Sequence, residues 1–454
     1  MWEAQLSLPR ETLALRAALR SLGIAALQEE LDLGAASAEQ LGFVTALAER
    51  LSQAPFLPYA HEAGDASFRR LVARYLDRHF GLRLSEDSLF VAPEREQAVY
   101  SFLLATCDPG DTVLVSRSLH PLYARALDKA GVRATVTHNT LGEIRRLLSA
   151  FDVKAVLLTV EPGERTNLAV LRDIVAEAAR RGIWVVLDES AFFNITGDVE
   201  PRTLFEFLAR TQHSPNLVIL YGLIKNAVWP DLELTLLLPV PEPLRADLEV
   251  AAEVTYSRIS VLAEWFYERT FSELLAFRMA FAEPVPPSPH RAPEVPLPRS
   301  RRIAKLSELP AFAPKFFRED DPELVRLDYG ENEGPMPLPL VEGLIAAGVA
   351  PRADGAQTGL AEAVAAFLLE TRGARYAPED VVVAPGVWPL MHHLGVALRQ
   401  RLGRMPRVFL VTPCYGVLEP TFLAAGCEVD SGPLGTLLSR RARGTTPAAV
   451  VLSQ

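Results

Sequence analysis

The chain has 454 residues and a net charge of -10. Its length leaves room for about two or three domains with full cores, and its acidic balance, without a basic stripe, argues against nucleic acid as the main partner. The apolar runs are too short to cross a bilayer, no secretory signal is evident and the three cysteines have no metal-ligand spacing, so we expect a soluble cytoplasmic protein with no membrane partner and no metal site.

The first 54 residues are expected to form a helical segment. Leucine and alanine recur at helical spacing over residues 9–22, and Gly23 follows as a helix stop. A turn-rich stretch then leads into a second predicted helix over residues 68–80, and residues 88–107 are predicted as a strand followed by a helix. The first helix contains no group that suggests chemistry, so we expect it only to cover another surface.

Three short apolar runs mark the centre of the chain. They cover residues 156–160, 183–187 and 217–220, and an amphipathic helical segment separates the first two. This pattern predicts a strand, a crossover helix and a strand of a parallel sheet. Asp188 directly follows the second run and Lys225 follows the third. Both should therefore lie at the carboxyl edge of the sheet, where open α/β folds bind ligands.

An acid and an amine at one sheet edge suit pyridoxal phosphate (PLP) chemistry, because the lysine can form a Schiff base and the acid can keep the pyridine nitrogen protonated. Each residue alone has a simpler interpretation, as a helix cap or a solvated loop residue. The segments GDASFRRLVARYL, DPGDTVLV, GIWVVLDE and GLIKNAVWPDLEL, however, occur in an order and spacing that resembles the large domain of class I/II aminotransferases of PLP fold type I. The resemblance covers about residues 55–280.

The resemblance implies a three-layer α/β/α fold, PLP as cofactor and an amino acid or 2-oxo acid as small-molecule partner. It implies that Lys225 is the catalytic Schiff-base lysine, which also moves protons, and that Asp188 is the pyridinium partner. His120 aligns with the family's motif for stacking on the cofactor ring, although a histidine that caps or bridges a loop is an equally open interpretation. The family's small domain supplies the arginine for the substrate carboxylate, and it is missing from this module, residues 55–282. The sequence therefore names no substrate.

Three acids depart from the family pattern. Glu94 lies in the turn that receives the phosphate, Glu164 replaces an asparagine that touches the cofactor, and Glu233 replaces the arginine that clamps the phosphate. A carboxylate about 4 Å from a phosphate costs about 4 kcal/mol at an effective dielectric near 20. Two hypotheses stay open: an active PLP-dependent transferase, favoured by Asp188 and Lys225, and a catalytically silent module with a regulatory or oligomerising role, which binds methionine-like ligands or organises a homo-oligomer.

Residues 253–282 are predicted as a long aromatic-rich helix or helix pair, and the proline-rich residues 283–300 as a stiff linker. In residues 301–454 the chain starts over: DVVVAPG aligns with SLFVAPE, and VFLVTPCYGVLEPTFLAAG with TVLVSRSLHPLYARALDKAG. We therefore expect a tandem whose second aminotransferase-like module is truncated to its first half, as in an incomplete product of a longer reading frame. His392 and His393 lie inside a helix with no third ligand, which does not favour metal binding.

The second copy carries family-like residues that the first copy lacks. Gly386 stands at the phosphate turn and Tyr415 at the ring-stacking position, so the resemblance implies both as cofactor-binding residues. The second copy has no lysine of its own for the cofactor. Because enzymes of this family build their sites at dimer interfaces, the tandem is expected to imitate a dimer, with Tyr415 facing the site of the first module.

A second resemblance narrows the family. The segments FLPYAHEAGDASFRRLVARYL, LYGLIKNAVWPDLELTLLL and YERTFSELLAFRMA, followed by a second module, are similar to the C-terminal aminotransferase-like region of the methionine S-methyltransferases. That family transfers a methyl group from S-adenosylmethionine through an N-terminal domain. No strand with a glycine-rich S-adenosylmethionine loop precedes residue 55, so we do not expect methyl transfer by this polypeptide alone. A methyltransferase domain is a further expected partner.

Overall fold

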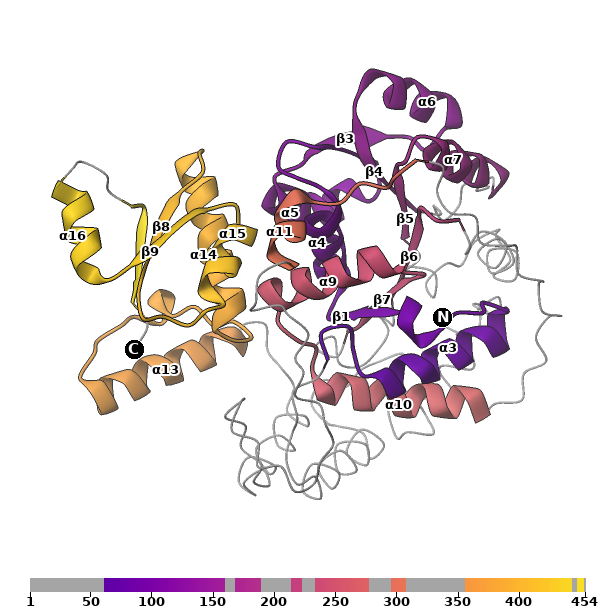
Figure 1. Cartoon of the computed structure of the whole chain (residues 1–454). Helices are drawn as coiled ribbons and strands as arrows, with labels where there is room; N and C mark the ends of the chain where they lie inside the picture. Colours follow the sequence, from indigo (N-terminus) through magenta and orange to yellow (C-terminus); the bar gives the residue numbers. More distant parts are fainter. Residues whose placement is uncertain are drawn as a thin grey trace, which may run out of the picture.

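The computed structural model describes residues 61–159, 168–188, 214–222, 233–276, 295–307, 356–442 and 447–452. The predicted helical segment 1–54, Glu164 and Lys225 lie outside these ranges. A large sheet with its helices, within residues 61–307, forms what we call the first unit, and a smaller sheet with its helices, within residues 356–452, forms the second unit. The two units lie side by side (Figure 1).

The sheet of the first unit has seven strands in the order β1-β7-β6-β5-β4-β2-β3. The strands are β1 Phe90–Ala92, β2 Thr112–Ser116, β3 Arg133–Thr137, β4 Val153–Thr159, β5 Trp184–Asp188, β6 Leu217–Gly222 and β7 Thr235–Leu238. The three predicted central strands are confirmed, and β4, β5 and β6 pair in parallel as expected. Outside the predicted unit, β7 is antiparallel to both β6 and β1. An apolar run predicts a strand but not its direction, because direction is set by pairing between distant segments.

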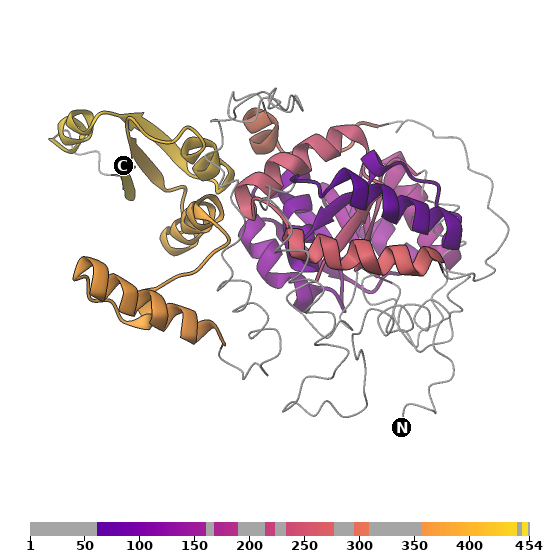
Figure 2. The same cartoon turned by 90° about the horizontal axis from the view of Figure 1, so that it is seen from below.

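Helices cover both faces of this sheet. They are α3 Ala66–Phe80, α4 Arg95–Thr106, α5 His120–Ala130, α6 Leu141–Ala150, α7 Leu168–Arg180, α9 Glu242–Thr255 and α10 Val261–Ala276. The strands β1, β2 and β3 follow one another in one direction across the sheet, so right-handed crossovers place α4 and α5 on one face. The strands β3, β4 and β5 follow in the opposite direction, so α6 and α7 lie on the other face. Figures 1 and 2 show this arrangement, with α9 beside α4.

The predicted helix over residues 68–80 is confirmed as α3. Asp65 caps its amino end by accepting from the backbone N–H groups of Ser67 and Phe68, and Gly81 ends it in the left-handed conformation that glycine adopts without strain. The predicted helix or helix pair after residue 253 is a pair, α9 and α10, as far as Ala276. Ser257, with a φ of 65°, lies in the break between them.

α4 is the central helix of the molecule. Every residue from Ala98 to Thr106 is buried, because the helix packs against the sheet, α5 and α9 at once. This explains why its sequence is apolar all round instead of on one stripe. Cys107, which caps its carboxyl end, is fully buried, and the prediction that it belongs to the core is confirmed.

The end of the predicted linker, residues 295–300, is hydrogen-bonded to the first unit. Arg299 donates to both carboxylate oxygens of the fully buried Asp247 in α9, at 2.7 Å each, and Trp184 of β5 donates its indole N–H to the Pro298 carbonyl at 2.8 Å. The helix α11 Arg301–Ser307 follows, with Ile303 and Leu306 in the core. This stretch is therefore bound to the protein surface and does not act as a free spacer.

The second unit contains a three-stranded parallel sheet in the order β10-β8-β9, formed by β8 Arg407–Val411, β9 Glu428–Gly432 and β10 Ala449–Leu452. Its helices are α13 Ala356–Arg372, α14 Val387–Leu402, α15 Leu418–Ala424 and α16 Leu434–Ala442. The strand order is the one that β4, β2 and β3 have in the first unit, with a helix between each pair of consecutive strands. Its hydrophobic cluster is small and is built around Val408, Leu410 and Phe422.

Candidate functional site at the carboxyl edge of the first sheet

Asp188 is the last residue of β5 and is 3% exposed. Its neighbour in the sheet is Leu220, two residues before β6 ends, so the chain that continues toward Lys225 leaves the sheet beside this carboxylate. The Thr159 hydroxyl donates to the Asp188 backbone carbonyl at 2.9 Å. The predicted place of Asp188 at the carboxyl edge is confirmed, while its juxtaposition with Lys225, outside the described residues, stays a prediction.

Tyr123 holds the Asp188 side chain. Its hydroxyl, on α5, donates to Asp188 Oδ2, and the ring is 1% exposed. Burial, followed by the negative charge of Asp188, raises the pKa of Tyr123 well above its usual value, so the phenol keeps its proton and remains a donor. Sequence reasoning missed this role. The available signal was spacing, since Tyr123 lies one helical turn after His120 on the helix that follows β2.

His120 is the first residue of α5 and is half-buried. This places it near the start of the same helix as Tyr123, on the side of the sheet where Asp188 lies. No described contact distinguishes ring stacking from loop bridging, so both interpretations of His120 remain predictions.

The turn before α4 is acidic, as the sequence indicates. Glu94 is the residue before the helix, in an extended conformation, and its side chain makes no capping hydrogen bond. The Glu94 side chain is exposed, yet its pKa is raised. The largest cause is desolvation, followed by the negative charges of Glu96 and Glu233. Arg95, the first residue of α4, has its Nε 3.9 Å from Glu233 Oε1. The cation nearest the helix start therefore faces an internal carboxylate.

Thr235, the first residue of β7, lies in the sheet between Ala92, which precedes the turn before α4, and Gly222, which ends β6. It is fully buried, and its hydroxyl has no hydrogen-bond partner within the described part of the chain. Buried hydroxyls are usually satisfied, so the Thr235 hydroxyl is an exception within the described residues.

Of the two predicted residues of the second unit, one lies directly before α14 and the other after β8. Gly386 precedes α14 with a φ of 111°, a conformation that favours glycine. Tyr415 follows β8, is 58% exposed, and its ring centroid lies 5.8 Å from that of Trp388. Whether Tyr415 faces the site of the first unit stays a prediction, because that site depends on Lys225.

His392 has a different role from metal binding. It is fully buried where α14 meets α4, and its Nε2 lies 2.7 Å from the hydroxyl of Tyr100. Burial, followed by the neighbouring His393, lowers the pKa of His392 to about 3, so the ring is neutral near pH 7. Arg399, one turn beyond Gly395 on α14, donates to the carbonyl of Lys129 at the end of α5. These contacts join the two units.

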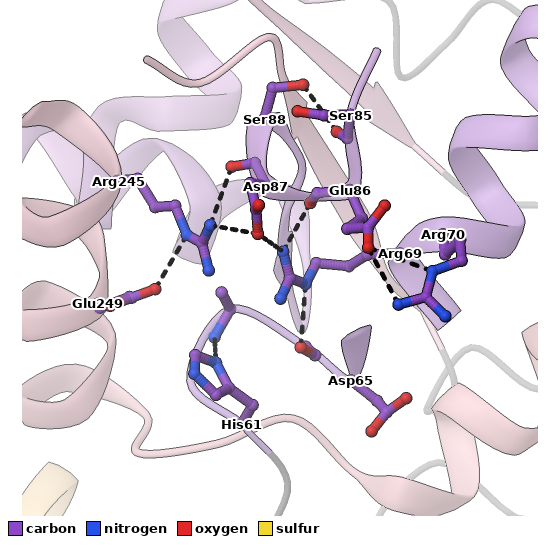
Figure 3. A network of polar contacts seen from close by, with 12 residues as sticks. His61, Asp65, Arg69, Arg70, Ser85, Glu86, Asp87, Ser88, Arg245 and Glu249 are labelled. Carbon is purple, nitrogen blue, oxygen red and sulfur yellow. Dashed lines mark hydrogen bonds and ion pairs between the residues drawn. The ribbon is translucent and has the colours of Figure 1, made fainter. Parts of the chain in front are cut away.

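A polar network that sequence reasoning did not single out anchors the start of α3 (Figure 3). Arg69, 3% exposed, donates to the Gly64 carbonyl at 3.1 Å and to the Glu86 carbonyl at 2.6 Å. Arg245 of α9 donates to Asp87 at 2.8 Å and to Glu249 at 3.1 Å. The network ties the turn before α3 to α9 and to the 3-10 helix η2 Glu86–Ser88. Its arginines contact backbone carbonyls and carboxylates, which is a structural role.

The described residues suit the pyridine nitrogen of PLP, but they place negative charge where its phosphate would lie. Asp188, buried and oriented by Tyr123, suits a protonated pyridine nitrogen. The start of α4 offers backbone N–H groups and Arg95 to a phosphate, but Glu94, Glu96 and Glu233 surround that place with negative charge.

Comparison with known proteins shows what part of this chain is similar to. Residues 31–230 match the family described as Aminotransferase class I and II. The chain is 24% identical over 253 residues to a methionine S-methyltransferase of Arabidopsis thaliana and 25% identical over 263 residues to one of Zea mays. These alignments cover 53% and 54% of this chain and 24% of each relative, so the chain spans about a quarter of the length of these relatives.

Among solved structures, an aspartate aminotransferase variant of Thermus thermophilus has a TM-score of 0.42 and 19% identity, over 57% of this chain and 72% of that one. Within the described residues, none of the helices is long and apolar enough to cross a membrane.

Proposed function

We propose that the aminotransferase class I and II-like domain of this chain is a PLP-dependent transferase acting on an amino acid or a 2-oxo acid, within a methionine S-methyltransferase-like protein. The relatives of that name align with this chain only over their aminotransferase-like part, so methyl transfer itself is not included in the proposal.

The observation that carries the proposal is the position of Asp188. A carboxylate that is 3% exposed is costly to bury unless a partner compensates it. Tyr123 donates a hydrogen bond to it, and its place at the sheet edge where α/β folds bind ligands suits it to face a protonated pyridine nitrogen. PLP, when bound, supplies an electron sink for bonds at the substrate α-carbon. Tyr123 would orient the carboxylate, and Lys225, by its sequence position after β6, would hold the cofactor and move protons.

An absorption titration with PLP tests the proposal. We expect the purified wild-type chain to develop a new band that borohydride reduction fixes to the protein, and we expect Lys225→Ala to develop none. An Asp188→Asn variant should weaken PLP binding and shift the band, because the pyridine nitrogen loses its counter-charge. Absence of a band at millimolar PLP in the wild type would contradict the proposal.

The second candidate is a catalytically silent module with a regulatory or oligomerising role. The observation that favours it is the pairing of Arg95 with Glu233, which sets a protein carboxylate where a ligand phosphate would need a cation. On this hypothesis the wild-type chain gives no band with PLP, while its oligomeric state, measured by sedimentation, depends on an intact second unit.

The predicted tandem arrangement also remains a proposal. It is supported by the common strand order of β10-β8-β9 and β4-β2-β3, and by α14 and α4, the helices that precede β8 and β2 in the two units. The proposed imitation of a dimer has a direct test. An experimental structure with Tyr415 far from Lys225 across the contact between the units would contradict it.

A further inference from the structure

We propose that His392 is a proton-sensitive switch between the two units: the second unit stays docked on the first while the imidazole is neutral, and it separates when the imidazole gains a proton. The inference concerns the assembly of the two units and does not depend on the proposed function. It rests on the place of the ring, on the charges around it and on the way in which the units touch.

The helices α14 and α15 of the second unit form the contact with the first unit. α14 packs against α9, and α15 packs against α9 and α11. Ala424, at the end of α15, is fully buried and belongs to the same hydrophobic cluster as the core of the first unit. A new charge on α14 is therefore a new charge at the contact between the units.

The ring of His392 lies inside this contact. It is fully buried, and its Nε2 is 2.7 Å from the hydroxyl of Tyr100 on α4 of the first unit. Burial raises the pKa of Tyr100, so the phenol keeps its proton and can donate it to Nε2 of a neutral ring. The group that the first unit offers to the imidazole is thus itself neutral, and it cannot balance a positive charge on the ring.

The charges that act on His392 are mainly positive. Burial and then His393 lower the pKa of His392 most, and Arg302 of α11 and Arg399 of α14 add to this effect. The backbone of Thr421 in α15 acts in the opposite direction, but less strongly than burial and His393. A proton on the ring is therefore disfavoured by residues of both units as long as they stay together.

The two arginines are held by backbone carbonyls. Arg302 donates to the carbonyl of Ala424 at 3.3 Å and to that of Cys107 at 3.4 Å, and Arg399 donates to the carbonyl of Lys129. These carbonyls lie at the carboxyl ends of α15, α4 and α5, where the helix dipole supplies only partial negative charge. Both guanidinium groups thus keep their positive charge at the contact.

The other charged groups of the packed helices do not offset this charge. Lys129 of α5 lies 3.8 Å from Glu96 of α4, and the two form an ion pair of their own. The helix α9 carries two buried acids, Asp247 and Glu253, but neither is among the groups that act most on His392. Within the described residues, a protonated His392 would therefore meet repulsion that no carboxylate compensates.

Labelling of a thiol at residue 424 measures separation of the units in the full chain. Ala424→Cys places a thiol that the first unit covers in the docked state, and mass spectrometry after reaction with a pyridyl disulfide reports its exposure. Division by the rate for the urea-unfolded chain at the same pH removes the pH dependence of the thiol itself. From pH 7.5 to 5.5 we expect the normalised rate to rise about tenfold, because the released ring takes up a proton below its ordinary pKa of 6.5 and the docked ring does not.

Two variants of neighbouring residues assign the effect. His392→Gln keeps a polar side chain beside Tyr100 but cannot take up a proton, so it should remove the rise. The matched control, His393→Gln on the same helix, should keep it. Equal normalised labelling at the two pH values, or a rise that persists in His392→Gln, overturns the proposal.

The pH profile decides where a variant does not fold, as judged by circular dichroism. In a chain that keeps His392, a rise that begins below pH 6.5 supports the proposal, and a rise that begins only below about pH 5 reports carboxylates and overturns it. Should the Ala424→Cys chain itself not fold, the same profile is measured on the wild type through hydrogen exchange of the α15 amides.

Discussion

The strand β1 and its counterpart in the second unit show how much a pairing partner contributes. Phe90 and Val91 of β1 are fully buried, and β1 pairs with β7. Val382 and Val383, which align with them in the sequence, are 72% and 56% exposed, and residues 381–384 form no strand. Two segments with almost the same sequence pattern therefore differ in structure, because a strand needs a neighbour that satisfies its backbone.

The largest expected effect separates these two segments. Phe90→Ala should lower the free energy of unfolding by about 3–5 kcal/mol, because it leaves a cavity in a packed core. Val382→Ala should change it by less than about 0.5 kcal/mol, because the side chain is largely in solvent. Urea unfolding followed by circular dichroism gives both values. Equal losses in the two variants would show that residue 382 is covered in solution.

A buried acid in the first unit gives the second prediction. Glu264 of α10 is 4% exposed, accepts from the Asp65 backbone N–H at 2.6 Å and faces Asp65, Glu268 and Arg69. Burial raises its pKa from 4.5 to about 7, so the folded state retains a proton that the unfolded chain releases. The first unit should therefore lose about 1–3 kcal/mol of stability as the pH rises from 5 to 8. Glu264→Gln should remove most of this dependence in denaturant unfolding measured at both pH values.

His392 should give a pH dependence of opposite sign at the contact between the units. Its folded-state pKa is lowered to about 3, so the contact is at full strength above the ordinary value of 6.5 and weakens as the pH falls toward 3. At pH 5.5 the cost should be about 1–1.5 kcal/mol. Protection of the α14 amides from hydrogen exchange at pH 7.5 and 5.5 checks it, with His393→Gln as the neighbouring control. Equal protection at the two values, after correction for intrinsic exchange, would contradict the prediction.

The smallest expected effect is that of breaking an exposed ion pair. Arg407→Gln removes an exposed cross-strand pair with Glu428, and it should change stability by less than about 1 kcal/mol. Arg299→Gln, in contrast, leaves the fully buried Asp247 without its bidentate partner and should cost more. Thermal unfolding of the two variants ranks them, and the reverse order would show that Asp247 finds another partner.

Local patterns predicted the helix over residues 68–80, the three central strands and the place of Asp188 at the carboxyl edge. They also indicated an acidic turn before α4 through Glu94. They could not predict that Tyr123 donates to Asp188 or that Arg95 lies against Glu233, because each contact joins segments 65 and 138 residues apart. The burial of His392 against Tyr100 was equally unpredictable, since it depends on how two units pack.

By itself, the sequence of this protein determined the helix over residues 68–80, the three central strands and the chemistry of single residues. An apolar residue at every second position selects a strand, and a period of about 3.6 residues selects a helix, both over short distances. The order of the apolar runs then favours parallel strands joined by crossover helices. Only the tertiary structure decided that β7 runs against its neighbours, which buried side chains meet at the sheet edge, and which of two similar segments becomes a strand. Those outcomes depend on pairing and packing between distant parts of the chain, whose free energies no local pattern contains.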